Sequence, residues 1–201
     1  MPPDSSATKA RLLDAARAEF SQYGLAGARV DRIAAAAAAN KRLIYVYFGS
    51  KDELFDLVIE RCLASAAEAV RFDPEDVPGY AAALFDYLVA NPETLRLTTW
   101  NQLERGTSTQ PSSEIYRGMV RALATAQRHG AADASFDPLD VIALVQSLVR
   151  AWFGASPALR GAGSEDPWSA KRLAKHRAAV VEAVRRVVAA KPGNQRRARS
   201  T

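Results

Sequence analysis

The stretch "NKRLIYVYFGSKDELF", residues 40–55, decides the fold of the N-terminal part of this chain. Isoleucine, two tyrosines and a phenylalanine occupy four of the five positions 44–48, directly after Lys41 and Arg42, and the run ends at Gly49. Asparagine is a preferred helix N-cap, and glycine commonly ends a helix. The stretch therefore predicts a short helix that is both basic and aromatic.

A second helix start follows at once. Ser50 and Glu53 have the S-x-x-E spacing of a capping box, in which each side chain bonds to the backbone N–H of the other residue. This spacing predicts a helix that runs to about Val70. The free N–H groups of its first turn, together with Lys51, would attract an anion such as a phosphate.

Two helices are also predicted before this stretch, at about 7–23 and 30–37, with Gly24 ending the first. The apolar positions of the first helix recur at helical spacing: Leu12, Leu13, Ala16, Phe20 and Tyr23. Three short helices, the second and third joined by a tight turn, form the arrangement of a helix-turn-helix. The third helix, from Lys41 to about Tyr47, is then the one that enters the DNA major groove.

In this arrangement Lys41, Arg42 and Leu43 face bases and phosphates, since they begin the third helix. Tyr45 and Tyr47 each have an apolar body and a hydroxyl that reaches a phosphate oxygen. Each residue type also has an ordinary explanation. Lys41 and Arg42 could belong to a solvated surface, and aromatic residues at helical spacing usually belong to a core. Only their order along the chain favours the DNA-binding interpretation.

Ile44 and Phe48 are four residues apart and therefore share one face of the third helix. We expect this face to be buried against Leu13, Ala16 and Ile33 of the two preceding helices.

The composition is that of a globular chain: 201 residues, of which 48% are hydrophobic and 24% charged. Cys62 is the single cysteine, so a disulfide framework is excluded and a reducing compartment is expected. Neither a signal peptide nor an apolar run of membrane-spanning length is recognisable. These features predict a cytoplasmic protein that is not bound to a membrane.

The positive charge lies near the two ends of the chain. Residues 1–50 contain seven basic and four acidic residues, a net charge of +3, and residues 191–201 contain four basic residues and no acid. The total is +5, which leaves −2 for the residues between them. A basic N-terminal part suits an anionic partner, whereas the tail has the character of a disordered, solvated terminus.

The rest of the chain also shows helical periodicity, and nothing in it reads convincingly as a strand. We therefore predict an all-α fold with a helix-turn-helix domain, a connecting helix, a ligand-binding and dimerisation domain and a basic tail. These parts are assigned to residues 1–50, 51–70, 71–190 and 191–201. Helices are expected at 78–90, 92–104, 112–128, 138–153 and 168–190, with a loop at 154–167.

The N-terminal motifs resemble those of the tetracycline-repressor (TetR) family of transcriptional regulators. The matching pattern covers roughly residues 8–60 and consists of Leu13-x-x-Ala16, Phe20, Gly24, Ile33-Ala34 and Ile44-Tyr45-Val46-Tyr47-Phe48-Gly49-Ser50-Lys51-Asp52-Glu53-Leu54. The resemblance implies a bacterial regulator that binds double-stranded operator DNA on the nucleoid. It implies backbone contacts from Tyr45, Tyr47 and Lys51, with residues 41–43 nearest the bases.

Two positions depart from the family pattern. Ala38 stands in the turn where the family usually has glycine, so either a left-handed conformation there costs on the order of 1 kcal/mol or the turn differs slightly from that of the family. Arg29 stands where the family often has a capping threonine or serine. Arginine cannot cap a helix in that way, but it can reach a phosphate.

The resemblance further implies that the C-terminal domain binds a small-molecule effector and forms a homodimer. Candidate pocket residues are the aromatics Phe85, Tyr87, Trp100, Tyr116 and Trp152, although for each one taken singly ordinary core or interface packing is the more common explanation. The apolar stripes of 138–153 and 168–190 fit a pair of helices that dock on their twofold mates.

We find no catalytic constellation, no metal-ligand cluster and no cofactor motif in the sequence. His129 lies at a helix end, His176 lies among cations, and Cys62 has the setting of a small core residue. The interpretation is a ligand-responsive repressor and not an enzyme. The alternative is an all-α ligand-binding or small-molecule-transforming protein whose N-terminal helices no longer contact DNA.

Overall fold

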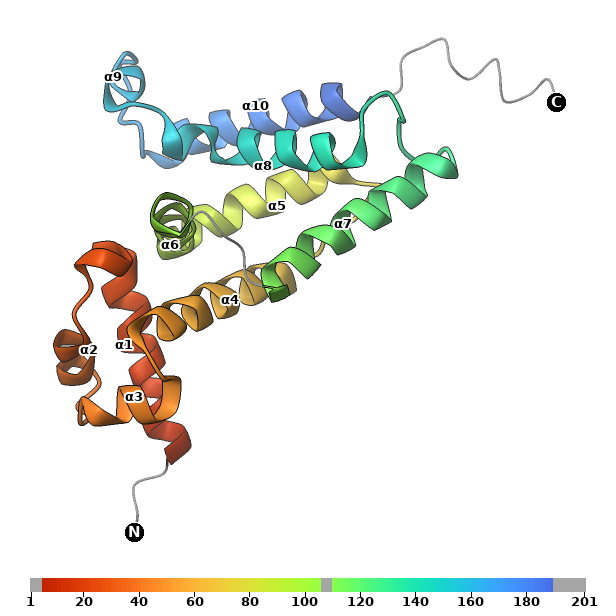
Figure 1. Ribbon diagram of the computed structural model, residues 1–201. Coiled ribbons are helices and arrows are strands. Elements are labelled where there is room, and N and C mark those ends of the chain that lie inside the picture. The colour runs from red at the N-terminus through yellow and green to blue at the C-terminus, as the bar shows by residue number, and fades with distance from the viewer. Residues whose placement is uncertain (1–4, 106–109, 190–201) are drawn as a thin grey trace, which may run out of the picture. The chain divides into compact units, whose positions relative to one another are not determined.

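The computed structural model describes residues 5–105 and 110–189 (Figure 1). Within these ranges every regular element is a helix, which confirms the prediction of an all-α fold. The basic tail predicted at 191–201 lies outside the described residues.

The helices follow one another without strands between them in the described part of the chain. Their bounds are α1 Ser5–Gly27, α2 Val30–Ala36, α3 Arg42–Phe48, α4 Lys51–Ala69, α5 Val77–Ala90, α6 Pro92–Glu104, α7 Gln110–Arg128, α8 Pro138–Gly154, α9 Pro157–Arg160 and α10 Ala170–Val188.

Helix α9 lies within residues 154–167, for which the sequence predicts a loop. Its start is local: the Ser156 hydroxyl accepts a hydrogen bond from the Leu159 N–H at 3.1 Å, and Pro157 stands at the first helical position. Serine before proline is a recognised helix start. The single turn was missed because no apolar periodicity accompanies it.

The chain divides into two compact units, which we describe separately. Unit 1 contains residues up to Ala66 together with Ala90–Glu114, and unit 2 contains Ala67–Val89 and the residues from Ile115 onward. Helix α6 thus belongs to unit 1, although its sequence position placed it in the range 71–190. The physical reason is that α6 packs on α1. Leu97 of α6 is fully buried in the same hydrophobic core as the apolar residues of α1.

Unit 1 is built around the apolar faces of its helices. The rings of Phe20 from α1 and Phe55 from α4 meet edge to face, with centroids 5.0 Å apart. Ile44 and Phe48 of α3 are buried in the same cluster as Leu13, Ala16 and Ile33, as predicted. The cluster includes Leu12, Leu13, Ala16, Phe20, Ile33, Ala34, Ile44, Phe48, Leu54, Phe55, Val58, Ile59 and Leu97.

Gly24 breaks α1 before its last residues, with φ 68° and ψ −173°. The two N–H groups that follow, of Leu25 and Ala26, donate hydrogen bonds to the carboxylate of Glu104 at the end of α6. The Trp100 ring lies directly against Gly24. A side chain from α6 therefore supplies the partner that the helix break requires.

Arg105, the residue after Glu104 at the C-terminal end of α6, binds to α4. The Arg105 guanidinium donates to the Asp52 carboxylate at 2.9 Å and to the Asp56 carboxylate at 2.5 Å. Since Glu104 holds α1 and Arg105 holds α4, the end of α6 links two helices of unit 1.

In unit 2, α8 and α10 run side by side (Figure 1) and bury valines between them: Val141, Val145, Val149, Val180 and Val184. Phe85 of α5 is buried against this pair, with its ring centroid 5.5 Å from that of Phe153 and 5.8 Å from that of His176. The Arg177 side chain of α10 forms an ion pair with Asp86 of α5 at 2.8 Å.

His176 is half-buried between aromatic rings. Burial, and then the nearby Arg172 charge, lower the pKa of its imidazole from 6.5. The unfolded chain therefore binds a proton at this histidine more readily than the folded protein does. We expect the free energy of unfolding to fall as pH decreases below about 6.5, and the free energy of unfolding of the His176→Gln variant to fall less steeply. Urea titrations of both proteins at pH 7.5, 6.5 and 5.5 measure the two slopes. Equal slopes in the two proteins would contradict the role given to His176.

Candidate nucleic-acid interface

The helix-turn-helix begins with a cap that comes from α1. The Glu19 carboxylate, buried to 8% exposure, accepts a hydrogen bond from the Arg29 N–H at 2.8 Å and one from the Arg32 Nε at 2.7 Å. Arg29 itself makes no side-chain cap at the start of α2. Glu19 thus accepts from the N–H of the N-cap residue, as the glutamate of a capping box does, but from ten residues away on α1.

Glu19→Ala is expected to destabilise unit 1 by about 2–3 kcal/mol, because the Arg29 N–H and the Arg32 guanidinium both lose the buried carboxylate that holds the start of α2. Urea unfolding followed by circular dichroism measures the change. Glu93→Ala is the matched control: Glu93 pairs with Arg17 at 2.6 Å, but both side chains are more than one-third exposed. The control should cost less than about 1 kcal/mol, and equal losses would show that Glu19 is not a cap.

The turn between α2 and α3 contains a residue in the left-handed region. Ala38 has φ 48°, which confirms the conformation expected where the family has glycine. Two contacts hold the turn: the Ala39 N–H donates to the Ala34 carbonyl at 3.0 Å, and the Arg11 Nε donates to the Ala37 carbonyl at 3.1 Å. These bonds offset a strain of about 1 kcal/mol at Ala38.

Both predicted caps around α3 are present. The Asn40 Oδ1 accepts from the Arg42 N–H at 2.8 Å. In the capping box, the Ser50 N–H donates to the Glu53 carboxylate at 2.8 Å, and the Glu53 N–H donates to the Ser50 hydroxyl at 3.1 Å. The start of α3 and the start of α4 are therefore both fixed by local hydrogen bonds.

The predicted contact residues divide by exposure. Arg29, Lys41, Arg42 and Tyr45 are exposed, whereas Leu43, Tyr47 and Lys51 are half-buried. Tyr45 is 47% exposed, which leaves its ring and hydroxyl accessible. The open face of α3 therefore combines cations with an aromatic side chain.

Val46 is 64% exposed on the same helix and was not singled out from the sequence. The position of Val46 in the helix could have indicated from the sequence that its side chain is exposed. Val46 lies two residues from both Ile44 and Phe48, so it points away from the buried face of the helix. Its side chain is therefore accessible on the open face of α3.

Lys41 is not free in the isolated chain. Its Nζ lies 2.8 Å from the Asp31 carboxylate on α2. The hydrogen bond between them raises the pKa of Lys41 and lowers the pKa of Asp31. Because both groups are exposed, a phosphate can replace Asp31 as the partner of Lys41 at little cost.

Two further lysines lie at the edges of α3. The Lys51 Nζ donates to the Ala28 carbonyl at 3.2 Å, which fixes the side chain beside the α1–α2 connection. The Lys9 Nζ lies 5.6 Å from the centroid of the Phe48 ring. Lys9 was not among the predicted contacts. It is 39 residues from Phe48 in the sequence, and no helical spacing connects residues so far apart.

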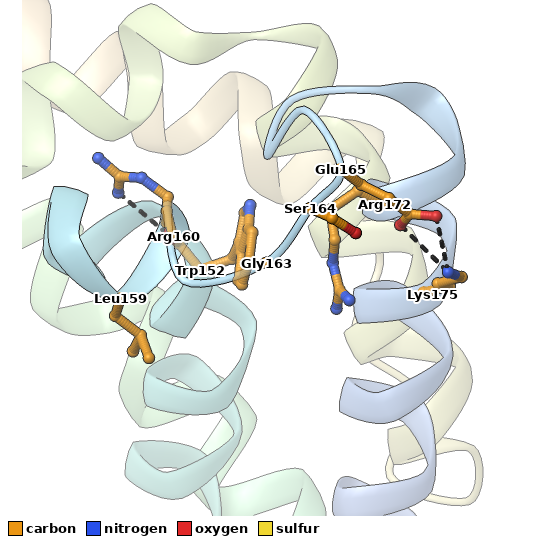
Figure 2. Close-up of a pocket in the computed structure, with 8 residues that line it drawn as sticks. All are labelled: Trp152, Leu159, Arg160, Gly163, Ser164, Glu165, Arg172 and Lys175. Carbon is orange, nitrogen blue, oxygen red and sulfur yellow. Dashed lines mark hydrogen bonds and ion pairs between the residues drawn. The ribbon is translucent and has the colours of Figure 1, made fainter.

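The five predicted pocket aromatics do not form one group. Trp100 belongs to unit 1, where it packs against Gly24. The other four belong to unit 2, where Phe85 is buried and Tyr87, Tyr116 and Trp152 are half-buried. Of these four, Trp152 lines the pocket shown in Figure 2.

No three histidine, cysteine or carboxylate side chains of residues 5–105 and 110–189 come together as metal ligands. Over the same ranges no helix has the length and apolar character needed to span a membrane.

Two family models match the chain. Residues 12–58 match the bacterial regulatory proteins of the tetR family, and residues 76–186 match the tetracyclin repressor-like C-terminal domain. The first match contains the whole α2–α3 region. The second covers more than half of the chain.

Individual relatives agree with the family models. The chain is 41% identical to the HTH-type transcriptional repressor SCO4008 of Streptomyces coelicolor over 161 residues, 78% of this chain and 83% of that protein. It is 34% identical to the HTH-type transcriptional repressor NicS of Pseudomonas putida over 54% of each chain. The solved structure of the transcriptional regulator SCO4942 from Streptomyces coelicolor has a TM-score of 0.79 and 38% identity, over 92% of this chain and 99% of that chain. The chain is a member of the TetR family of bacterial transcriptional regulators.

Proposed function

We propose that the protein is a homodimeric repressor that binds a palindromic DNA operator and is released from it by a small molecule. The observation that carries the proposal is the open face of α3, where Arg42, Tyr45 and Val46 are exposed while Ile44 and Phe48 anchor the helix. Repression and release by ligands are typical of the family. A regulator of this kind acts in the cytoplasm, on the nucleoid when it is bound to DNA.

In the proposed complex α3 lies in the major groove. Lys41, Arg42 and Leu43 are nearest to the bases, since the early residues of a recognition helix meet base edges. Arginine and lysine pair best with guanine in this groove.

The phosphate contacts flank the base contacts. Tyr45, Tyr47, Lys51 and Arg29 are proposed to bind the DNA backbone, since each carries a hydroxyl or a cation on α3 or at the start of α4 or α2. The N-terminus of α4 adds its free N–H groups beside Lys51.

We add Val46 to the base contacts. An exposed apolar side chain in the major groove fits the methyl group of thymine. The proposal therefore includes one apolar contact next to the polar ones, so the operator should carry a thymine opposite Val46.

A dimer follows from the small size of the recognition helix, because α3 has seven residues and reads few base pairs. Support comes from α8, whose side opposite the buried valines is exposed and lined with small or apolar residues: Ala143, Leu144, Ser147 and Ala151. Small side chains let two helices approach closely. Pairing of α8 and α10 with their twofold mates is the proposed dimer interface.

Selection of bound sequences from random duplex DNA by the purified protein tests the proposal. The expected result is an inverted repeat whose halves are centred about one helical turn apart, bound by an even number of chains. Arg42→Ala and Val46→Ala should each change the preferred base at one position of every half-site, whereas Tyr47→Ala should weaken binding without changing the preference. Enrichment of no motif, or of a single half-site without its repeat, would overturn the proposal.

A further inference from the structure

The end of α8, helix α9, the loop that follows it and the first turns of α10 line an open pocket of about 400 Å³ in unit 2 (Figure 2). This volume is at the lower end of the range of small-molecule sites. Figure 2 shows Leu159 and Arg160 on one side of the pocket and Glu165 and Lys175 on the other. The proposed DNA contacts contribute no residue to it.

The lining is positively charged. Arg160, Arg172 and Lys175 face it with only one acidic side chain, Glu165. Glu165 already binds two lysines, with its carboxylate 2.9 Å from the Lys175 Nζ and 3.0 Å from the Lys171 Nζ. These lysines lower the pKa of Glu165, so the carboxylate stays ionised and fully engaged.

The positive charge is also placed against the local preference of the helix. The first turn of α10, capped by Ser169, contains no acidic residue, and Lys171 and Arg172 stand there instead. Cations are unfavourable at a helix N-terminus, where the dipole is already positive. An anion in the pocket would relieve this repulsion.

Arg160 and Arg172 differ in how they are bonded. The Arg160 Nη1 donates to the carbonyls of Phe153 at 3.1 Å and Ala155 at 2.6 Å, so this arginine caps the end of α8. The Arg172 Nε is buried and has no hydrogen-bond partner among the residues described. A buried N–H of a charged group without an acceptor is costly. Of the two arginines that line the pocket, Arg172 is therefore the one with a guanidinium N–H that lacks an acceptor.

The uncharged lining residues are Trp152 and Leu159, which are apolar, together with Gly163 and Ser164. The Trp152 ring is fixed by its Nε1, which donates to the Pro167 carbonyl at 3.0 Å, and the Arg172 guanidinium lies 4.8 Å from the ring centroid. Leu159, 64% exposed, is a second apolar lining residue. Next to Trp152, the buried Nε2 of His176 also finds no partner among the residues described.

We propose that this pocket binds a small organic carboxylate, with the carboxylate at Arg172 and the apolar body against Trp152 and Leu159. A guanidinium binds a carboxylate through paired, charge-assisted hydrogen bonds. A cationic ligand would meet the excess of positive charge, and a purely inorganic anion would leave the apolar wall unused. That such a carboxylate acts as the effector rests on the proposed function, whereas its binding does not.

Titration calorimetry with benzoate as the probe tests the site. The expected result is one benzoate per chain, with benzamide, its neutral counterpart, and inorganic phosphate each binding at least tenfold more weakly. Arg172→Gln should weaken benzoate binding at least tenfold. Arg185→Gln removes an exposed cation from the same helix, outside the pocket, and should leave benzoate binding unchanged. Leu159→Glu, a change at an exposed position, should abolish binding even if Arg172→Gln does not fold.

Absence of benzoate binding overturns the proposal, as does equal binding of benzoate and benzamide or of benzoate and phosphate. Unchanged benzoate binding by Leu159→Glu also overturns it. Operator binding is measured on the same protein without benzoate. Intact operator binding with no benzoate binding contradicts the pocket alone, whereas benzoate binding without operator binding contradicts the proposed function alone.

Discussion

Arg42→Ala combined with Tyr45→Ala is expected to lower the affinity for operator DNA by about a hundredfold or more. Each side chain stands exposed on α3, and contacts of this kind are worth about 1–3 kcal/mol each. The fall in affinity should be accompanied by a shallower dependence on salt, because one cation fewer releases counterions. Fluorescence anisotropy with labelled operator at several salt concentrations measures both quantities.

The matched control removes a cation of unit 2. Arg185→Ala changes the net charge by the same amount as Arg42→Ala, but Arg185 lies on α10 and pairs with Glu182. It should alter operator affinity less than threefold. The double variant should keep the thermal midpoint of the parent protein, since neither residue is buried. A double variant that binds operator as the parent does would show that α3 is not the DNA-contacting helix.

Gly24→Ala is expected to destabilise the protein by about 2–4 kcal/mol, the sum of a left-handed backbone and a steric overlap. Gly24 has φ 68°, and an added Cβ would lie 2.7 Å from a Glu104 carboxylate oxygen and 2.8 Å from the Trp100 ring. Both neighbours belong to the end of α6, and Glu104 cannot move without breaking its hydrogen bonds to Leu25 and Ala26. Urea unfolding measures the loss.

Gly118→Ala is the control of opposite sign. Gly118 lies inside α7, and an added Cβ there meets no atom within 4 Å. The substitution should raise stability by up to about 1 kcal/mol, because alanine is the better helix former and restricts the unfolded chain. Equal effects of the two substitutions would contradict the role assigned to Gly24.

The parts of the fold that could be predicted from the sequence are those made within a few residues of one another. The capping box of Ser50 and Glu53 and the Asn40 cap each join residues two or three positions apart, so their spacing is visible in the sequence. The burial of Ile44 and Phe48 follows from helical periodicity in the same way.

Contacts between distant residues could not be predicted in this way. Glu19 caps α2 from ten residues away, and Glu104 satisfies N–H groups 79 and 78 residues away. Neither glutamate differs in sequence from one on a solvated helix face. The assignment of α6 to unit 1 depends on such a contact, which explains why the sequence position of α6 was misleading.

The predicted pocket residues show a further limit of sequence reasoning. The prediction rests on aromatic residues, yet large aromatics fill cores more often than they line cavities. Phe85 is buried in packing, and Trp100 covers a helix break. The pocket around Trp152 is instead charged by residues of a loop and of the start of α10, such as Glu165 and Arg172, which no apolar pattern singles out.

The central claim is that the face of α3 recognises a specific DNA sequence. The most direct measurement is equilibrium binding of the purified protein to duplexes from the region beside its own gene, compared with duplexes of the same composition in scrambled order. The account predicts that one native duplex binds at least a thousandfold more tightly than the scrambled duplexes, and that its affinity falls steeply with salt. Equal affinity for native and scrambled duplexes, or no binding at low salt, would contradict it.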